Sequence, residues 1–202
     1  MLLVFLTQAA FANEGIYDRD LVRGFLTLKG DFRSQKSNGL KLINAVTGEK
    51  YVKQFVSGHV EIGAEYNKLQ TWFDVDFMPI TPTRGSTEWY TYGITWMWGY
   101  KLLAQNSRFN IIPSLGPGFG LLNIRMNSTQ DVKSSLGPAL NLELELRLQF
   151  SQFSAGLYGG YKVERHDWGE NFKDINTDKV FAGLKLRWTM LNNFQKRERE
   201  ME

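Results

Sequence analysis

The side chains best suited to acid–base chemistry are two histidines that each lie close to an acid. His59 comes two residues before Glu61, and His166 immediately precedes Asp167. Neither histidine belongs to a nucleophile pattern such as Gly-x-Ser-x-Gly, and no helix follows the glycine-rich string around Gly116, which therefore is not a phosphate-binding loop. We predict that His59 is an internal hydrogen-bonding residue, that His166 is a polar loop residue, and that no residue is catalytic.

Composition excludes several other kinds of site. The chain has no cysteine, so thiolate metal sites and disulfides are absent, and no metal or cofactor is predicted from the spacing of the remaining ligand types. The 24 basic and 21 acidic residues leave a net charge of only +3, which does not predict a nucleic-acid-binding surface.

A larger group of charged residues alternates with apolar residues along the chain, as Glu143, Glu145 and Arg147 do between leucines. Charges that share one buried surface must be paired, because an isolated buried charge is very costly. Glu164 lies on the same face of its segment as the others. We predict a charge network made of Arg23, Lys29, Glu61, Glu65, Asp74, Asp76, Glu143, Glu145, Arg147, Lys162, Lys185 and Arg187.

The elements that must position these charges are strands, because apolar and polar residues alternate with a period of two through most of the chain. We expect eight strands, at about 22–32, 51–66, 69–77, 90–102, 109–124, 136–150, 153–164 and 179–188. Three prolines, Pro113, Pro117 and Pro138, fall inside these segments, and Pro117 predicts a bulge or bend. The large aromatic residues with the parity of the polar face are Phe25, Phe55, Trp72, Trp89, Tyr158 and Phe181.

The composition fits an all-β chain of one domain. In 202 residues with 14% aromatic residues and a mean hydropathy of −0.32, there is no run of roughly 18 apolar residues that would form a transmembrane helix. Two classes remain open on these grounds, a soluble all-β protein and a membrane β-barrel.

Three observations favour a barrel with its apolar face outside. The interior of an eight-stranded barrel is too narrow for the roughly forty sizeable apolar side chains of that face. Connections at 67–68, 103–108 and 151–152 are short, whereas those at 33–50, 79–87, 125–133 and 165–178 are long, as in outer-membrane barrels. Glycines on the polar face would make room inside a narrow lumen: they are Gly93, Gly99, Gly116, Gly118, Gly120, Gly156, Gly160 and Gly183.

With these features the chain resembles the small eight-stranded bacterial outer-membrane β-barrels, the outer-membrane protein A-like and X-like group. Gly183, Leu186 and Trp188 fit the Gly-x-x-Φ-x-Φ part of the C-terminal signal of such proteins, although Phe181 stands where a polar residue is expected. The resemblance implies a monomer in the bacterial outer membrane. It also implies three partners, which are the barrel assembly machinery, outer-membrane lipid and lipopolysaccharide.

Two terminal segments are expected to lie outside the barrel, which we place at 13–188. Residues 1–12 combine a short apolar core with Ala10-Phe11-Ala12, which predicts the remnant of a signal peptide cleaved after Ala12. Residues 189–202 are strongly charged and are expected to form a periplasmic tail.

The function expected from these features is that of a non-enzymatic outer-membrane barrel with a structural, surface-exposed or narrow-pore role and a salt-bridged lumen. Two alternatives remain open. One is a membrane-embedded lipid-modifying enzyme of the lipid A deacylase or acyltransferase type, although the His-x-Ser motif of the deacylases is absent. The other is a secreted soluble barrel that binds a hydrophobic ligand.

Overall fold

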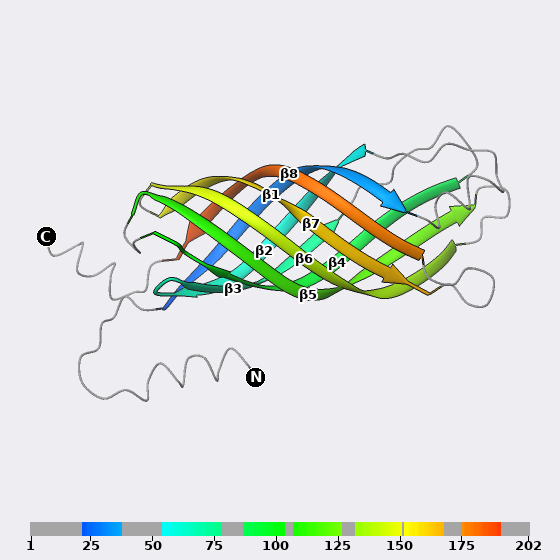
Figure 1. Ribbon diagram of the computed structural model, residues 1–202, viewed down its shortest axis with the longest axis horizontal. Coiled ribbons are helices and arrows are strands. Elements are labelled where there is room, and N and C mark those ends of the chain that lie inside the picture. The colour runs from blue at the N-terminus through cyan, green and yellow to red at the C-terminus, as the bar shows by residue number, and fades with distance from the viewer. Residues whose placement is uncertain are drawn as a thin grey trace, which may run out of the picture.

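The chain folds into a single closed barrel of eight strands (Figure 1). The structure, a computed structural model, describes residues 22–37, 54–77, 87–103, 107–126, 132–150, 152–167 and 175–190. The strands are β1 (Val22–Ser37), β2 (Gln54–Tyr66), β3 (Leu69–Phe77), β4 (Thr87–Tyr100), β5 (Phe109–Met126), β6 (Val132–Phe150), β7 (Phe153–His166) and β8 (Ile175–Thr189). Each strand pairs with its neighbours in the sequence, all antiparallel, and β1 pairs with β8 to close the barrel.

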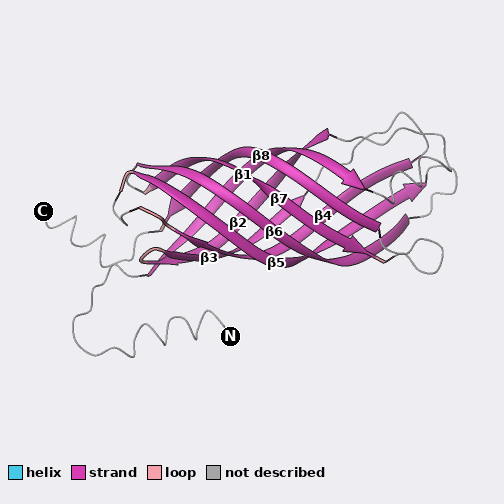
Figure 2. Cartoon of the chain, in the orientation of Figure 1, coloured by secondary structure: helices cyan, strands magenta, loops and turns pink. Residues whose placement is uncertain are grey.

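Figure 2 shows strands and connections only in the described part of the chain. Among these residues there is no helix long and apolar enough to cross a membrane.

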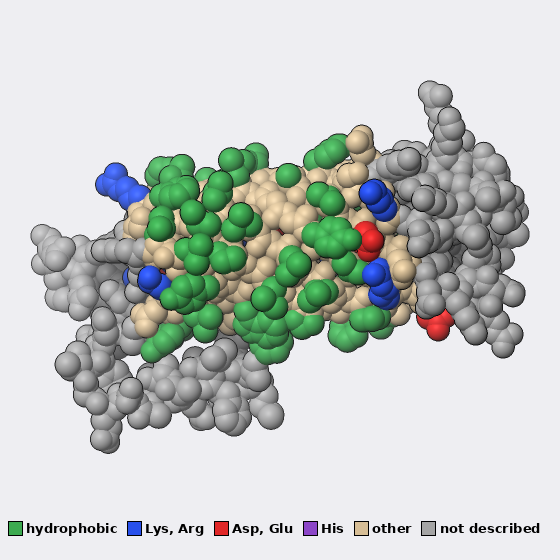
Figure 3. Space-filling view, viewed as in Figure 1, with side chains coloured by type: hydrophobic (Ala, Val, Ile, Leu, Met, Phe, Trp, Pro, Cys, Tyr) green, Lys and Arg blue, Asp and Glu red, His purple; other side chains and the backbone are tan. Residues whose placement is uncertain are grey.

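The period of two in the sequence becomes an inside-out distribution of side chains, because successive residues of a strand point to opposite faces. On β6, Leu142, Leu144 and Leu146 are 47%, 50% and 40% exposed, whereas Glu143 and Glu145 between them are 4% and 2% exposed. Figure 3 shows hydrophobic side chains spread over the outer wall, with charged side chains near the two ends. The predicted eight-stranded antiparallel barrel, apolar outside and charged inside, is confirmed, and its interior is unsuited to a hydrophobic ligand.

The two ends of the barrel differ. At one end, which we name the turn end, a two-residue turn at Asn67–Lys68 joins β2 to β3, and Asn67 has a φ of 54°. Asparagine tolerates this left-handed conformation better than most residues, which suits it to a tight hairpin. β1 begins at this turn end, because it is antiparallel to β2, which ends there. β8 is antiparallel to β1 and therefore ends at the turn end. The opposite end, reached by the ends of β1, β3, β5 and β7, is named the loop end.

Several strands extend further toward the loop end than the alternation predicted. β1 continues to Ser37, β7 includes His166 and β8 begins at Ile175. The prediction that His166 belongs to a loop is therefore wrong, and its side chain is only 2% exposed. The strict alternation of long and short connections also fails, because β4 and β5 are joined through 101–108 whereas β5 and β6 are separated only by 127–131.

The prolines do not shift the strand register. Pro117 pairs opposite Leu140 within an unbroken β5–β6 ladder. On its other side, the β4–β5 pairing lapses between Thr95↔Gly118 and Trp98↔Leu115 and then resumes in the same register. Because proline has no N–H, a ladder bond is lost there. No extra residue is accommodated, so the predicted bulge is not formed.

Candidate functional site

The barrel interior contains sixteen buried charged side chains, which we name the charged plug. Eight are basic and eight are acidic, so the described interior is electrically balanced when its histidines are neutral. The basic residues are Lys29, Arg33, Lys101, Arg147, Lys162, Lys179, Lys185 and Arg187, and the acidic residues are Asp31, Glu61, Glu65, Asp74, Asp76, Glu143, Glu145 and Glu164.

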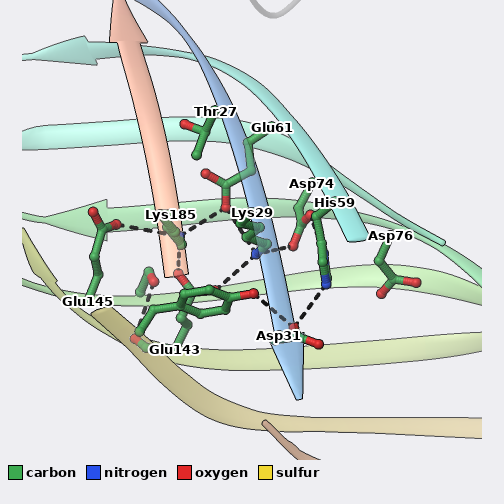
Figure 4. A network of polar contacts seen from close by, with 12 residues as sticks. Thr27, Lys29, Asp31, His59, Glu61, Asp74, Asp76, Glu143, Glu145 and Lys185 are labelled. Atoms are coloured by element: carbon green, nitrogen blue, oxygen red, sulfur yellow. Dashed lines mark hydrogen bonds and ion pairs between the residues drawn. The ribbon is translucent and has the colours of Figure 1, made fainter. Parts of the chain in front are cut away.

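Two lysines occupy the centre of the plug, Lys29 on β1 and Lys185 on β8 (Figure 4). Lys29 Nζ lies 2.7 Å from Asp74 Oδ2, 3.0 Å from Glu61 Oε1 and 3.1 Å from Glu143 Oε2. Lys185 Nζ lies 3.0 Å from Glu61 Oε1 and also contacts Glu143. Glu61 and Glu143 therefore bridge both lysines, and the pairs link β1, β2, β6 and β8 across the lumen. Charge-assisted hydrogen bonds in such a poorly hydrated interior are strong.

Toward the turn end, Glu145 is surrounded by three cations. Its carboxylate accepts hydrogen bonds from Arg147 Nε at 2.5 Å and from a second guanidinium nitrogen at 2.9 Å. Lys185 Nζ lies 3.4 Å from Glu145 Oε2, and Arg187 Nη2 lies 4.0 Å from the same oxygen. The contact with Arg147 is the bidentate arrangement that holds a guanidinium in one orientation.

Gln70 connects this group to a further ion pair. Its side-chain oxygen accepts hydrogen bonds from Arg187 at 2.8 Å and Arg147 at 3.2 Å, and its amide nitrogen donates to Glu65 at 3.2 Å. Glu65 in turn lies 2.9 Å from Lys101 Nζ. A neutral amide can serve both charge signs because it carries an acceptor and donors in one side chain.

Toward the loop end, Lys162 and Lys179 share Glu164. Lys162 Nζ lies 3.0 Å from Glu164 Oε1 and also contacts Asp76, and Lys179 Nζ lies 2.7 Å from Glu164 Oε2. His166 Nε2 lies 3.6 Å from Glu164 Oε2. The last residues of β7 thus contribute to the plug.

His59 lies between two carboxylates from different strands. Its Nδ1 is 2.9 Å from Asp74 Oδ1 and its Nε2 is 3.0 Å from Asp31 Oδ2, with Arg33 also in contact with Nε2. Asp31 accepts further hydrogen bonds from Arg33 Nε at 2.8 Å and from the Tyr158 hydroxyl at 2.9 Å. The position of His59 inside the barrel agrees with the prediction, and its role here is to cross-link β1 to β3.

Aromatic side chains fill the space beside the turn-end charges. Phe25, Trp72 and Met97 form a buried apolar cluster. The Arg187 guanidinium carbon lies 3.7 Å from the centre of the Phe25 ring, and Lys185 Nζ lies 5.4 Å from that of Trp72. Such cation–π contacts stabilise cations whose hydrogen bonds are incomplete. The inward direction predicted for Phe25, Phe55, Trp72, Tyr158 and Phe181 is confirmed, and the side chain of Trp89 lies outside the described part of the structure.

The described part of β4 and β5 brings no charge into the lumen, and glycines there leave room for charges from the opposite wall. A Cβ added to Gly93 would lie 2.6 Å from Lys162 Nζ, and one added to Gly120 would lie 2.8 Å from the carboxyl carbon of Glu164. The long charged side chains of β7 therefore occupy the volume that side chains of β4 and β5 would otherwise take.

The structure places eleven of the twelve predicted network residues in the plug. The exception is Arg23, which is half-buried at the turn end and forms no ion pair with the described residues. Five plug residues lie outside the predicted network. Asp31, Lys101, Glu164 and Lys179 have the polar-face parity of predicted strands, whereas Arg33 falls in the connection predicted at 33–50. The alternation of Asp31, Arg33 and Gln35 with Phe32 and Ser34 was the available signal for the longer β1.

The described residues do not form a catalytic group around either histidine. His166 Nδ1 faces the carbonyl oxygen of Ser135 at 3.2 Å, while the Ser135 hydroxyl donates to the carbonyl oxygen of Asp167 at 2.8 Å. The serine hydroxyl is therefore not oriented toward the imidazole as a nucleophile would be. No group of three or more potential ligand side chains in the described part of the chain is placed to hold a metal ion.

On β8, the residues of the predicted assembly signal lie on both faces. Leu186 and Trp188 point outward, with exposed fractions of 65% and 43%, and Gly183 faces the lumen. Their recognition by the assembly machinery remains a prediction. The predicted signal peptide at 1–12 lies outside the described residues, as does the tail after Met190, and β8 extends one residue past the predicted barrel boundary to Thr189.

No protein-family model matches this sequence, and no curated protein sequence matches it. Among solved structures, the barrel is similar to Neisserial surface protein A, with a TM-score of 0.54 and 15% identity over 80% of this chain and 95% of that one. It is also similar to Ail, the attachment invasion locus protein of Yersinia pestis, solved with the heparin analogue sucrose octasulfate. For Ail the TM-score is 0.52 with 12% identity, over 83% of this chain and 99% of the other. The chain therefore has the fold of the small eight-stranded outer-membrane barrels.

Proposed function

We propose that this protein is a monomeric, non-enzymatic β-barrel of the bacterial outer membrane whose lumen is closed by the charged plug. The observation that carries the proposal is the inside-out arrangement, in which apolar side chains cover the outer wall and sixteen charges are buried within. An outer wall covered by apolar side chains is stable in lipid but would cause aggregation in water. The outer wall would then contact outer-membrane phospholipid and lipopolysaccharide.

The turn end would face the periplasm and the loop end the cell exterior, as in bacterial outer-membrane barrels generally. Assembly would proceed through the barrel assembly machinery, with Gly183, Leu186 and Trp188 as its recognition residues. The role is structural, surface-exposed or that of a narrow pore, because a wide aqueous channel needs many more strands than eight.

The test is extraction of the protein from outer membranes, followed by electrophoresis in SDS with and without heating. A folded barrel resists SDS until heated and so changes its mobility, whereas a soluble β-protein found in the periplasmic fraction would contradict the proposal.

In planar bilayers we expect no stable conductance of porin size. A large, steady conductance of the unmodified protein would contradict the closed lumen.

The alternative of a lipid-modifying enzyme makes a separate prediction about the host lipid. If His59 and His166 are structural, the double variant His59→Asn, His166→Asn leaves the acyl-chain number of lipid A unchanged by mass spectrometry. The control is a strain lacking the protein, which should also show unchanged lipid A. A change in acyl-chain number that depends on either histidine would contradict the non-enzymatic assignment.

A further inference from the structure

The outer wall is not uniform, because it carries two adjoining apolar depressions in the half nearer the turn end. The larger, with a volume of about 690 Å³, crosses β3 to β7 and is lined by Tyr100, Pro113, Leu115, Leu142 and Leu144, among others. The smaller, of about 560 Å³, crosses β6 to β8. Both volumes fall in the range of small-molecule sites, roughly 300–1,000 Å³. The two depressions share Leu144 and Gly159, so they meet at these residues.

The strand register explains both the position and the direction of the larger depression. Leu69 pairs with Tyr100 at the turn end, Pro113 pairs with Leu144, and Leu144 pairs with Gly159. Because the strands of a barrel are tilted, a row of paired residues climbs along the wall as it passes from strand to strand. The depression therefore runs from the turn-end rim, at Leu69 and Tyr100, to the middle of β7, at Gly159.

Small residues create the junction of the two depressions. Gly159 points outward between Leu157 and Tyr161 and faces Ala182 on β8. A Cβ added at Gly159 would lie 3.2 Å from the Phe181 carbonyl oxygen, which is a tight contact, and 3.8 Å from the Ala182 Cβ.

Positive charge lies at the turn-end rim, near the start of the larger depression. Lys68 immediately precedes Leu69, and its carbonyl oxygen accepts a hydrogen bond from the Lys101 backbone N–H, which fixes this turn beside the end of β4. Arg108 is exposed and immediately precedes β5, the strand that carries Pro113 and Leu115. Lysine and arginine side chains at a membrane surface attract anionic lipid headgroups.

We infer that the larger depression seats an acyl chain of one phospholipid of the periplasmic leaflet, whose phosphate is attracted by the rim cations Lys68 and Arg108. The inference rests on the proposed membrane location and orientation. Two observations favour this occupant: the lining is mostly apolar, and the cations lie at the end where that leaflet has its headgroups.

The inference is tested by counting the phospholipids that stay bound to the full-length barrel in native mass spectrometry after mild detergent extraction from phosphatidylglycerol vesicles. The unmodified protein should retain one lipid. Gly159→Leu fills the junction and should reduce the retained fraction about tenfold, since a bound chain would lose much of its apolar contact. Gly24→Leu is the matched control, because Gly24 has the outward parity of β1, lines neither depression, and an added Cβ there would meet nothing nearer than Met190 Sδ at 3.6 Å.

The headgroup contact is tested with the double variant Lys68→Gln, Arg108→Gln, which should also lower phosphatidylglycerol retention about tenfold or more. Its control is Lys36→Gln, Arg165→Gln, which removes exposed cations at the loop end. Equal retention by all variants would overturn the seat, and so would a dimer that only Gly159→Leu dissociates, because the occupant would then be a second copy. Failure to insert into vesicles, seen as no heat-dependent mobility, would instead contradict the proposed function.

Discussion

At the scale of single residues, Glu145 is the acid on which the most cations of the turn-end group depend. Arg147, Lys185 and Arg187 all lie within 4.0 Å of its carboxylate, and the site is almost fully buried. A buried ion pair contributes little relative to a well-packed apolar pair, but losing one partner leaves an uncompensated charge. The plug is therefore expected to be far more sensitive to single changes than to paired ones.

Glu145→Gln should accordingly lower the free energy of unfolding by about 3–5 kcal/mol, measured by urea unfolding in lipid vesicles. Adding Arg147→Met to this variant should recover part of the loss, since it removes the cation that the lost acid held most closely. Asp178→Asn is the control, because its pair with Arg165 is largely exposed and such pairs contribute about 0–1 kcal/mol. An unchanged midpoint for Glu145→Gln would show that this carboxylate is solvated.

At the scale of a strand, β7 offers two adjacent glycines with opposite requirements. An added Cβ at Gly160 would lie 2.1 Å from the Leu142 carbonyl oxygen and 2.6 Å from the Phe181 ring, whereas one at Gly159 would meet nothing nearer than the Phe181 carbonyl oxygen at 3.2 Å. Gly160→Ala should destabilise the barrel by about 1–3 kcal/mol through overpacking, and Gly159→Ala should change it far less. The difference between the two unfolding midpoints measures this directly, and equal effects would contradict the assignment of their faces.

β6 provides the corresponding test of the outer wall. Leu144, half-exposed in the middle of this strand, should face the lipid near the bilayer midplane, so Leu144→Arg should cost about 2–4 kcal/mol of stability in vesicles. Phe150→Arg, at the turn-end terminus of the same strand, should cost about 0–1 kcal/mol because the headgroup region tolerates charge. Should Leu144→Arg fold in water without detergent, the membrane location would be contradicted.

The strands were predictable because a period of two leaves a signal in every residue pair, and the same signal gave the inward face of Glu61 or Lys185. Strand ends were less predictable, since Arg33 and Gln35 continue the alternation in a segment whose polarity is typical of loops. The pairing of charges was not predictable. Lys29 and Glu143 are far apart in the sequence and meet across the lumen, which depends on the register and tilt of the whole barrel.

At the scale of the whole molecule, the plug combines elements that are individually unbalanced. The described inward charges of β2 and β3 are all acidic (Glu61, Glu65, Asp74 and Asp76), whereas those of β8 are all basic (Lys179, Lys185 and Arg187). Neither group is neutralised by its own hairpin alone. The contact of Lys185 with Glu61 requires β1 to lie between β8 and β2 in the closed barrel.

This separation of charge has a consequence for the order of assembly. A partly inserted chain that still lacks its last strand would carry an excess of negative charge on its first hairpins, in surroundings that hydrate charge poorly. Closing such an intermediate without β8 would stabilise it little. When β8 pairs, it supplies the missing cations and the final ladder of hydrogen bonds together. We therefore expect the pairing of β1 with β8 to be cooperative with neutralisation of the interior, which would favour the closed barrel over an open sheet.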